Sequence, residues 1–495
     1  MIFEVTNSRT SIYGADPYSL WHFDLETRYP TLIAEAQAKG FQLPDQEEGG
    51  WDGWVRLLRQ PAKSLPWVPT GLLSRLIRIC EKMRFPYEVH DLRLRPDLGF
   101  PEFTKTPIID RPYQLEAAAA AEKAGRGVLD MPPRSGKTRT ICEIHRRIAL
   151  PTLWLAPTDR IVQQTLGVLE GFFGKNYAMH LIGTKEEDAA SRMHVVVCTA
   201  ATAAMLSPEF YKTREMLVAD EFHHGAAKSY HTDIFKKCDH IYYRFGMTGT
   251  FFRSGNDVLS LHALLSNVIY KVTSQELLDL GYLVNTQVAF IPVKSPRLRG
   301  MPDGSFQSGH GKHGIHEHKP RNQLVTWAAV TLYQLGKKTI ILVGTKKQGR
   351  ELVHMLRAFV RPSPASCQFQ SVEFVSTDTD RGIQGKIIQS FLDNEEVKIL
   401  IGTSLLGEGV DLPTADALVY ARGEKAEVTL TQNAYRVCTA TEGKTSAIIV
   451  DFADRHNKHL MAHSLERLGV YYREPTFNVK ILDDANDFGG WLRDL

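Results

Sequence analysis

Short runs of apolar, mostly β-branched residues alternate with longer segments of helical periodicity along most of this chain. Runs of about four to eight such residues predict strands. The first series comprises 127–131, 152–156, 194–199 and 215–220, and the second comprises 339–343, 372–376, 399–403, 417–420 and 447–452. Continuous apolar strands that alternate with helices are typical of parallel sheets buried on both faces. The pattern therefore predicts two tandem α/β domains, each with its own parallel sheet.

The strand series also suggest where the domains begin and end. A stretch with proline and lysine, 101–107, precedes the first series, and a turn-rich break at 293–320 separates the two. We expect a small α/β or α+β N-terminal domain at 1–104, sheet domains at 105–292 and 293–470, and a tail at 471–495. The N-terminal region holds four of the seven tryptophans, which suit core packing and base stacking equally. They are Trp21, Trp51, Trp54 and Trp67.

Composition narrows the class of protein further. The chain is 43% hydrophobic and 23% charged, as in ordinary globular proteins. Its six cysteines are widely spaced without a CxxC pair, which indicates reduced thiols and argues against a disulfide framework or a zinc site. Neither a signal-peptide pattern nor an apolar run of membrane-spanning length occurs, so we expect a protein of the bacterial or phage-infected cytoplasm. A net charge of +3 is too small to identify an anionic partner.

A phosphate-binding loop is predicted between the first strand and the helix that follows it. The segment Met131-Pro-Pro-Arg-Ser-Gly-Lys-Thr138 joins the strand 127–131 to a helical pattern over 138–150. We expect the backbone of Pro133, Arg134, Ser135 and Gly136 to surround the phosphates of ATP. Lys137 would reach the β- and γ-phosphates, and the Thr138 hydroxyl would ligate Mg²⁺. Met131 and Arg134 occupy positions where such loops commonly carry glycine.

A pair of carboxylates follows another predicted strand. Asp220 and Glu221 come directly after the apolar run 215–219. Because carboxyl ends of parallel strands share one edge of the sheet, we expect both carboxylates to lie near the phosphate loop. Asp220 can hold Mg²⁺, and Glu221 can orient or deprotonate the attacking water. A single Asp-Glu pair also suits a solvated loop end, but the two motifs together favour ATP hydrolysis.

Taken with the residues around them, these motifs resemble those of superfamily 2 helicases in kind and in order. Asp220-Glu-Phe-His223 resembles the DExH motif, and Tyr113-Gln114 resembles the adenine-reading motif. The other matches are Ala156–Gln164, Val197–Thr199, Thr248–Thr250, Val343–Lys347, Gly402–Asp411 and Gln432–Arg436. The resemblance spans about 108–455 and implies two RecA-like lobes, ATP and Mg²⁺ as cofactors, and a nucleic acid as the partner, which the N-terminal likeness described below specifies as DNA.

The resemblance also implies roles for individual residues. Gln432 and Arg436 would assist catalysis, and Arg436 would stabilise the charge that develops on the transferred phosphate. Gly409 and Asp411 would contribute to ATP binding, and His223, Thr248 and Thr250 would couple hydrolysis to movement. Contacts to the DNA backbone would come from Thr158, Arg160, Thr199, Thr345, Lys346 and Thr403. Such contacts carry no base sequence, although each threonine hydroxyl also suits a helix N-cap.

A second resemblance covers the N-terminal region. Gly50-Trp-Asp-Gly-Trp54, Leu57-Leu58 and Pro69-Thr-Gly-Leu72 are similar to the N-terminal domain of phage UvsW-type helicases. That likeness implies an accessory DNA-binding domain and a motor that unwinds or remodels branched DNA in recombination, repair or replication. Two alternatives remain open: a double-stranded DNA translocase of a defence or restriction assembly, and an ATP-gated clamp with low turnover.

Three features fall outside the helicase pattern. Thr439 stands where the family carries a second arginine, which argues for reduced turnover. The segment 309–318 holds four histidines among glycines, and we expect a mobile loop near DNA in preference to a metal site. The C-terminal tail mixes acidic and large apolar residues, so it either packs onto the motor or docks a protein partner.

Overall fold

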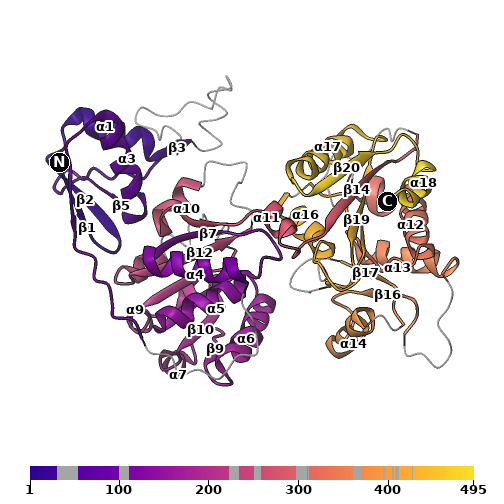
Figure 1. Cartoon of the computed structure of the whole chain (residues 1–495), viewed down its shortest axis with the longest axis horizontal. Coiled ribbons are helices and arrows are strands. Elements are labelled where there is room, and N and C mark those ends of the chain that lie inside the picture. The colour runs from indigo at the N-terminus through magenta and orange to yellow at the C-terminus, as the bar shows by residue number, and fades with distance from the viewer. Residues whose placement is uncertain are drawn as a thin grey trace. The chain divides into compact units, whose positions relative to one another are not determined.

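The computed structural model describes residues 1–30, 54–99, 111–221, 234–249, 258–296, 309, 311–360, 369–393, 396–403, 406, 412–425 and 427–495. These residues form two compact units, each with its own sheet (Figure 1). One unit holds Met1–Pro132 and Gly136–Val272, and the other holds Pro133–Ser135 and Thr273–Leu495. No described helix is both long and apolar enough to span a bilayer.

The chain begins with a small mixed sheet in the strand order β5-β2-β1-β6. β1 pairs antiparallel with β2 and parallel with β6. Phe3 and Val5 of the sheet and Phe23 and Leu76 of the two helices are fully buried in one hydrophobic core. The strands and helices are β1 (Ile2–Val5), β2 (Arg9–Tyr13), α1 (Pro17–Glu26), β3 (Arg28–Pro30), β4 (Trp54–Arg56), β5 (Trp67–Pro69), the short 3-10 helix η1 (Thr70–Leu72), α3 (Leu73–Met83) and β6 (Glu88–Asp91). The expected small α+β domain is therefore present.

This N-terminal domain packs directly against the first large sheet domain. Leu259 and Ala263 of α10 (Val258–Leu265) belong to the same hydrophobic cluster as the N-terminal core. A Cβ atom on Gly71 would lie 2.0 Å from the carbonyl oxygen of His262, so the backbones meet without room for a side chain. Buried Arg126 donates a hydrogen bond of 2.8 Å to the carbonyl oxygen of Asn7. The N-terminal domain and this lobe therefore share a closely packed interface.

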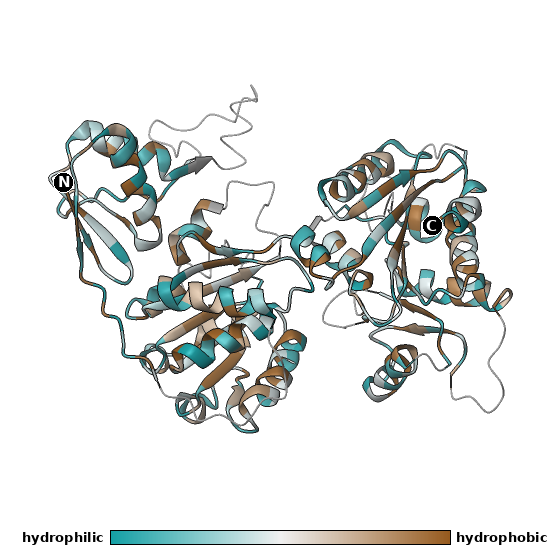
Figure 2. Ribbon diagram, in the orientation of Figure 1, coloured by the Kyte–Doolittle hydropathy of each residue, from teal (hydrophilic) through white to brown (hydrophobic). Residues whose placement is uncertain are grey.

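The first lobe contains a seven-stranded parallel sheet in the order β13-β7-β12-β11-β8-β10-β9. Its strands are β7 (Arg126–Asp130), β8 (Thr152–Ala156), β9 (Ala178–His180), β10 (Val195–Thr199), β11 (Met216–Ala219), β12 (Tyr243–Thr248) and β13 (Val268–Lys271). The helices beside it are α4 (Pro112–Ala124), α5 (Lys137–Ile148), α6 (Asp159–Phe173), α7 (Glu187–Ser191), α8 (Ala200–Met205), α9 (Pro208–Lys212), η4 (Phe235–Cys238) and α10. All four strands predicted here are present, and their apolar residues stand out in Figure 2.

The second lobe repeats this architecture with the strand order β16-β17-β15-β18-β19-β14-β20, again all parallel. Its strands are β14 (Asn285–Pro292), β15 (Thr339–Leu342), β16 (Val372–Val375), β17 (Ile399–Gly402), β18 (Ala417–Tyr420), β19 (Ser446–Ala453) and β20 (Phe477–Ile481). The helices are α11 (Ser274–Asp279), the short π-helix η5 (Lys312–His316), α12 (Lys319–Gln334), α13 (Lys346–Arg357), α14 (Arg381–Leu392), α16 (Glu427–Ala434), η6 (Tyr435–Val437), α17 (Lys458–Arg473) and α18 (Asp487–Arg493). The expected pair of RecA-like parallel-sheet domains is confirmed.

The second lobe extends beyond its expected bounds of 293–470 at both ends, with α11 and β14 before them and α17, β20 and α18 reaching past them. β14 pairs over its whole length with β19, although the sequence division placed it in the preceding domain. The turn-rich break follows this strand, because the chain leaves the sheet only after Pro292. β20 pairs with the other side of β14, and Phe488 and Leu492 of α18 are buried in the second core. The C-terminal tail is thus an integral part of the second sheet and its core.

Residues 311–318 of the histidine-rich segment are packed into the second lobe, so the expectation of a mobile loop is wrong for them. His316 and His318 are buried, and burial lowers the pKa of each to about 4. The ring of His318 stacks on that of His456 with centroids 4.3 Å apart. Among the described residues, no group of three or more histidine, cysteine or acidic side chains is placed to hold a metal ion. His310 lies outside the described residues.

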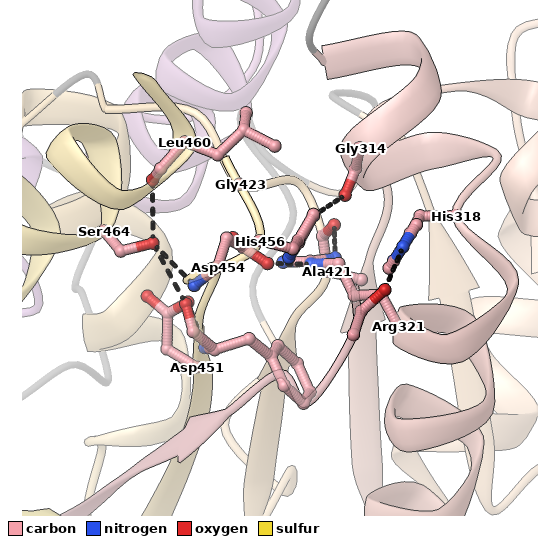
Figure 3. A network of polar contacts seen from close by, with 12 residues as sticks. Gly314, His318, Arg321, Ala421, Gly423, Asp451, Asp454, His456, Leu460 and Ser464 are labelled. Carbon is pink, nitrogen blue, oxygen red and sulfur yellow. Dashed lines mark hydrogen bonds and ion pairs between the residues drawn. The ribbon is translucent and has the colours of Figure 1, made fainter. Parts of the chain in front are cut away.

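A buried network of charges fixes this part of the lobe (Figure 3). Arg467 forms an ion pair of 2.9 Å with Asp451, and Arg321 forms one of 2.8 Å with Asp454. All four side chains are 0% exposed. The arginines also donate to the carbonyl oxygens of Gly423 and Ala421, so these buried groups tie the ends of β18 and β19 to helices α12 and α17. Buried charges are tolerated only when they are paired and hydrogen-bonded in this way.

Candidate nucleotide and nucleic-acid sites

The loop between β7 and α5 has the backbone that phosphate binding requires. Arg134 and Gly136 have φ angles of 70° and 78°, in the left-handed region. This conformation explains why glycine is common where Arg134 stands, because a side chain there costs backbone strain. α5 begins at Lys137 with no side-chain cap and no acidic residue in its first turn. Its N–H groups therefore remain available to an anion, and the helix dipole favours one.

Gln114 forms a hydrogen bond to the last residue of this loop before α5. Its side-chain oxygen accepts a hydrogen bond of 2.9 Å from the backbone N–H of Arg111, and its amide nitrogen donates to the carbonyl oxygen of Gly136 at 3.4 Å. A Cβ atom on Gly136 would lie 2.4 Å from that amide nitrogen, so Gly136 is needed for space as well as for φ. Tyr113, which is 4% exposed, accepts a hydrogen bond from the Arg111 side chain. Of the predicted adenine-reading pair, Gln114 thus contacts the backbone of the loop, and Tyr113 contacts Arg111.

The two predicted carboxylates lie at the same edge of the sheet as the loop. Lys137 Nζ is 3.0 Å from Glu221 Oε1, and both side chains are largely buried. β12 lies between β7 and β11 in the sheet, so the long lysine side chain spans the intervening strand. Glu221 has a φ of 46°, which is unusual for a residue with a side chain. Its backbone N–H donates to Asp220 Oδ1 at 2.9 Å, which orients the neighbouring carboxylate.

Asp220 has a strongly altered acidity. It is 6% exposed, and burial together with the neighbouring Glu221 raises its pKa to about 6. A buried carboxylate beside a second one is unfavourable unless a cation balances the pair. Lys137 supplies one positive charge here. Oxygen donors in a site of excess negative charge are the ligands that Mg²⁺ prefers, so Asp220 fits its predicted role. Thr138, the other predicted ligand, is the second residue of α5.

Thr248 links the phosphate loop to the strand between the two motifs. It is the last residue of β12, is fully buried, and accepts a hydrogen bond of 3.1 Å from the backbone N–H of Met131 through its carbonyl oxygen. A shift at the start of the loop is therefore transmitted directly to β12. Thr250 and His223, the other predicted coupling residues, lie outside the described residues, as do Gly409 and Asp411.

In the second lobe, α16 and η6 carry the predicted catalytic residues. Arg436 is 6% exposed, and its Nε donates to Asn433 Oδ1 at 3.2 Å. Asn433 is fully buried and was missed by the sequence analysis, although its spacing of three residues before Arg436 on a helix is a signal for such a contact. Gln432 is partly exposed on the same helix. Thr439 forms a β-bridge with Leu283, and its hydroxyl is buried without a hydrogen-bond partner in the described residues.

Three of the threonines predicted to contact DNA cap helices. Thr158, Thr199 and Thr345 accept hydrogen bonds from the backbone N–H groups of Ile161, Thr202 and Gln348. They therefore have the structural role that the sequence left open, at the C-terminal ends of β8 and β10 and just after β15. Thr403 directly follows β17 and is 9% exposed.

The two basic residues predicted to contact DNA lie in the first turns of the capped helices. Arg160 is the second residue of α6 and is partly buried. Lys346 begins α13, where it forms an ion pair with Asp378. A DNA phosphate at Lys346 would have to compete with that carboxylate. The threonine caps each accept from one backbone N–H group, and other N–H groups at both helix starts can bind phosphates directly.

Comparisons with known proteins match both lobes. Residues 108–253 match the family model described as "Type III restriction enzyme, res subunit", and residues 323–440 match "Helicase conserved C-terminal domain". The chain is 23% identical over 354 residues to the DNA 3'-5' translocase XPB2 of Sulfurisphaera tokodaii, which covers 66% of this chain and 77% of that protein.

A solved structure of an ATP-dependent restriction-modification enzyme shares the fold of the two lobes. The type ISP restriction-modification enzyme LlaBIII bound to DNA aligns with a TM-score of 0.56 at 15% identity, over 78% of this chain but only 32% of that enzyme. UvsW of bacteriophage T4 aligns over 97% of this chain and 99% of its own length, with a TM-score of 0.45 and 16% identity.

Proposed function

Because this chain is a superfamily 2 helicase, an ATP-driven motor that acts on DNA, we propose that it unwinds or remodels branched and partly single-stranded DNA during recombination, repair or replication. The observation that supports the branched substrate is the interface of the N-terminal domain with the first lobe. Since Gly71, Asn7 and Arg126 join the two bodies closely, DNA held by the N-terminal domain is held at a fixed place relative to that lobe.

The residues around the phosphate loop support a specific division of labour. Lys137 binds the β- and γ-phosphates of ATP, aided by the N–H groups at the start of α5. Asp220 and Thr138 hold Mg²⁺, which when bound neutralises charge on the phosphate oxygens. Glu221 orients the attacking water and accepts its proton. Arg436 stabilises the charge that develops on the γ-phosphate, and Asn433 fixes the orientation of its guanidinium group.

Movement along DNA follows from alternation between two sets of backbone contacts. The starts of α6, α8 and α13 bear Thr158, Thr199 and Thr345. Arg160 and Lys346 lie in the first turns of α6 and α13, and Thr403 directly follows β17. Contacts of this kind bind phosphates and ignore base sequence, so binding is salt-sensitive and sequence-independent. The name of the relative XPB2 specifies 3'-5' movement, and we propose the same direction for this chain.

A translocase of duplex DNA in a restriction or defence assembly is the second candidate. The match of the first lobe to the restriction-enzyme family favours it. An ATP-gated clamp with slow turnover is the third candidate, and Thr439 in place of a second arginine favours that one.

One experiment separates these functions. ATP hydrolysis is measured with single-stranded DNA, blunt duplex, forked DNA and RNA, alongside strand displacement from duplexes with 3' or 5' tails. The proposed function predicts the strongest stimulation by forked or single-stranded DNA and displacement from 3'-tailed substrates. Stimulation by blunt duplex without displacement supports the duplex translocase, and tight ATP-dependent binding without turnover supports the clamp. Lys137→Ala serves as the control and should show no hydrolysis while melting normally.

A further inference from the structure

Helix α1 of the N-terminal domain carries apolar side chains on two faces. Phe23 is fully buried and Leu20 packs against the same core, so one face covers the small sheet. Tyr18 and Trp21 on the other face are 57% and 55% exposed. A helix that only covers a sheet needs one apolar face. Of the six tryptophans in the described residues, Trp21 alone is mostly exposed, so the outward aromatics call for another explanation than core packing.

The outward side chains form an aromatic cluster with a shared orientation. The rings of Tyr18 and Trp21 lie within 19° of parallel, with centroids 6.4 Å apart. His22 packs edge-on against Tyr18 at 4.6 Å, and Phe85 packs edge-on against Tyr18 at 6.1 Å. These two neighbours support the Tyr18 ring from the side, and His22 also contacts Trp21. Nearly parallel exposed rings suit successive bases of a single strand, which are themselves parallel.

The charges around this cluster favour a polyanion. Arg78, Lys82 and Arg84, on or at the end of α3, are exposed, and none of them forms an ion pair with a carboxylate in the described part of the chain. Each of the two carboxylates within α1 lies near an arginine. Asp24 lies 3.5 Å from both Arg28 and Arg56, and Glu26 lies 3.7 Å from Arg75. Asp16 at the start of α1 and Glu81 of α3 have no ion pair in the described part of the chain, so three cations stand against two carboxylates and the region beside the aromatic cluster keeps a small net positive charge.

We propose that Tyr18 and Trp21 form a stacking platform for unpaired bases of a single DNA strand, whose phosphates are bound by Arg78, Lys82 and Arg84. The inference rests on the proposed function, because it names the surface through which the N-terminal domain engages single-stranded parts of a branched substrate. Base faces are apolar and phosphates are anionic, so one strand matches both the aromatic cluster and its charged margin. Recognition is indifferent to sequence, since every base has a stackable face.

The test compares strands with and without bases. The full chain is titrated with a fluorescent single-stranded oligonucleotide and with an abasic strand of the same length and charge. We expect the double substitution of Tyr18→Ala and Trp21→Ala to weaken binding of the normal strand by at least about 5-fold, and to leave binding of the abasic strand unchanged. Equal weakening on both strands overturns the proposal, because it would show that the side chains act without contacting bases.

Two control variants make the result specific. Trp21→Phe retains a stacking ring and should keep most of the affinity. Tyr472→Ala removes an aromatic side chain of matching exposure, 59%, from α17 in the second unit and should change neither affinity. A loss as large in Tyr472→Ala as in the double variant also overturns the proposal. The melting temperature of every variant should equal that of the natural chain, because the substituted side chains are mostly exposed.

Hydrolysis separates failure of this inference from failure of the proposed function. DNA-stimulated ATP hydrolysis at saturating DNA should persist in the double variant, since α1 carries none of the nucleotide-binding residues. Normal stimulation combined with unchanged strand affinity overturns the stacking platform alone. If the natural chain shows no hydrolysis stimulated by any DNA, the proposed function itself fails. A cluster that instead binds a protein would leave both strands bound equally by the natural chain and the variant, which also counts against the proposal.

Discussion

Lys137 Nζ lies 3.0 Å from Glu221 Oε1, so the proposed phosphate ligand and the proposed base form an ion pair with each other. The ammonium group cannot serve the carboxylate and the γ-phosphate equally well at once. Binding of ATP therefore competes with the pair, and it releases Glu221 to contact water. This exchange couples nucleotide binding to the freeing of the base.

Replacement of Glu221 by glutamine should separate binding from hydrolysis. Glu221→Gln removes the charge that holds Lys137 and removes the base, while the side chain keeps its length. We expect ATP to bind at least as tightly as in the natural chain and turnover to fall by about 10²-fold or more. Fluorescent-nucleotide titration and steady-state hydrolysis measure the two effects. Glu209→Gln, an exposed residue of α9, should change neither quantity. Natural turnover in Glu221→Gln would exclude it as the base.

The raised pKa of Asp220 makes stability depend on pH in a defined window. Burial raises the pKa from 3.8 to about 6, so the folded chain binds this proton more tightly than the unfolded chain. The contribution of Asp220 to stability is thus greatest below pH ~4 and is lost as the pH rises through about 6. Asp220→Asn should therefore stabilise the first lobe at pH 7.5, and this gain should shrink towards pH 5. Urea unfolding of both chains across this pH range measures the gain in stability. A gain independent of pH would contradict the assignment of the raised pKa to Asp220.

Activity should show the opposite dependence on pH. Protonated Asp220 is a poor ligand for Mg²⁺, so hydrolysis at limiting Mg²⁺ should fall as the pH drops through about 6. Excess Mg²⁺ should shift the midpoint to lower pH because the cation competes with the proton. A midpoint that does not respond to Mg²⁺ would mean that a different group controls the profile.

Arg436 is expected to carry most of the charge stabilisation, because the family's second arginine is replaced by Thr439. Arg436→Ala should lower turnover by at least about 10²-fold while nucleotide affinity changes less. Arg436→Lys should remain slow, since an ammonium group lacks the planar fork that Asn433 orients. Thr439→Arg should raise turnover, because the bridge of Thr439 to Leu283 involves the backbone and survives the change. Near-natural turnover in Arg436→Ala would assign the role to another residue, such as Arg422.

The interface of the N-terminal domain with the first lobe should be sensitive to one methyl group. Gly71→Ala would place a Cβ atom 2.0 Å from the carbonyl oxygen of His262, and we expect it to lower the stability of the first unit by about 1–3 kcal/mol. Gly167→Ala is the matched control, since it lies exposed in α6 with nothing within 4 Å of the added atom. It should raise stability by about 0.5–1 kcal/mol. Equal effects in chemical unfolding would show that the interface is not closely packed.

The stability of the second lobe should depend on the buried arginine Arg467. Arg467→Met would leave Asp451 without its cation at a site that is 0% exposed, and we expect a loss of about 3–5 kcal/mol. Lys425→Met breaks an exposed pair with Glu466 and should cost less than about 1 kcal/mol. Chemical unfolding of the two variants gives the comparison. Similar small losses in both would mean that the network contributes little to stability.

The hydrophobic pattern predicted the strands that are continuously apolar and missed those that are not. β12 escaped because Arg244 interrupts its apolar run, and that arginine is buried only because its guanidinium donates to the carbonyl oxygens of Ile241 and Cys238. β14 begins with Asn285-Thr-Gln, which resembles a loop, yet it is paired on both sides. The strands β19 and β20 that pair with β14 are remote in sequence, so no local pattern reveals this pairing.

The nucleotide-site motifs were visible in the sequence, but their contacts were not. Local spacing placed Lys137 in the loop after one strand and Glu221 just after another, whereas their ion pair depends on the strand order of the sheet. Residues that cap helices and residues that contact DNA have the same signature in sequence, as Thr158 and Thr345 illustrate. The buried histidines gave a wrong expectation for a similar reason. Polar residues among glycines are typical of a loop, whereas the burial of His316 and His318 depends on residues distant in sequence, such as His456.

The pairing of β14 with β19 and β20 has a consequence for folding during synthesis. β14 is the first strand of the second sheet to leave the ribosome, but its two neighbours, β19 and β20, are the last two strands of that sheet to be made. Until β19 and β20 have been made, both edges of β14 lack partners, and unpaired apolar edges invite association with other nascent chains. The first unit can fold while the second is still being made. The second must wait for β19 and β20, so chains that terminate before these strands should be the ones that chaperones retain or proteases remove.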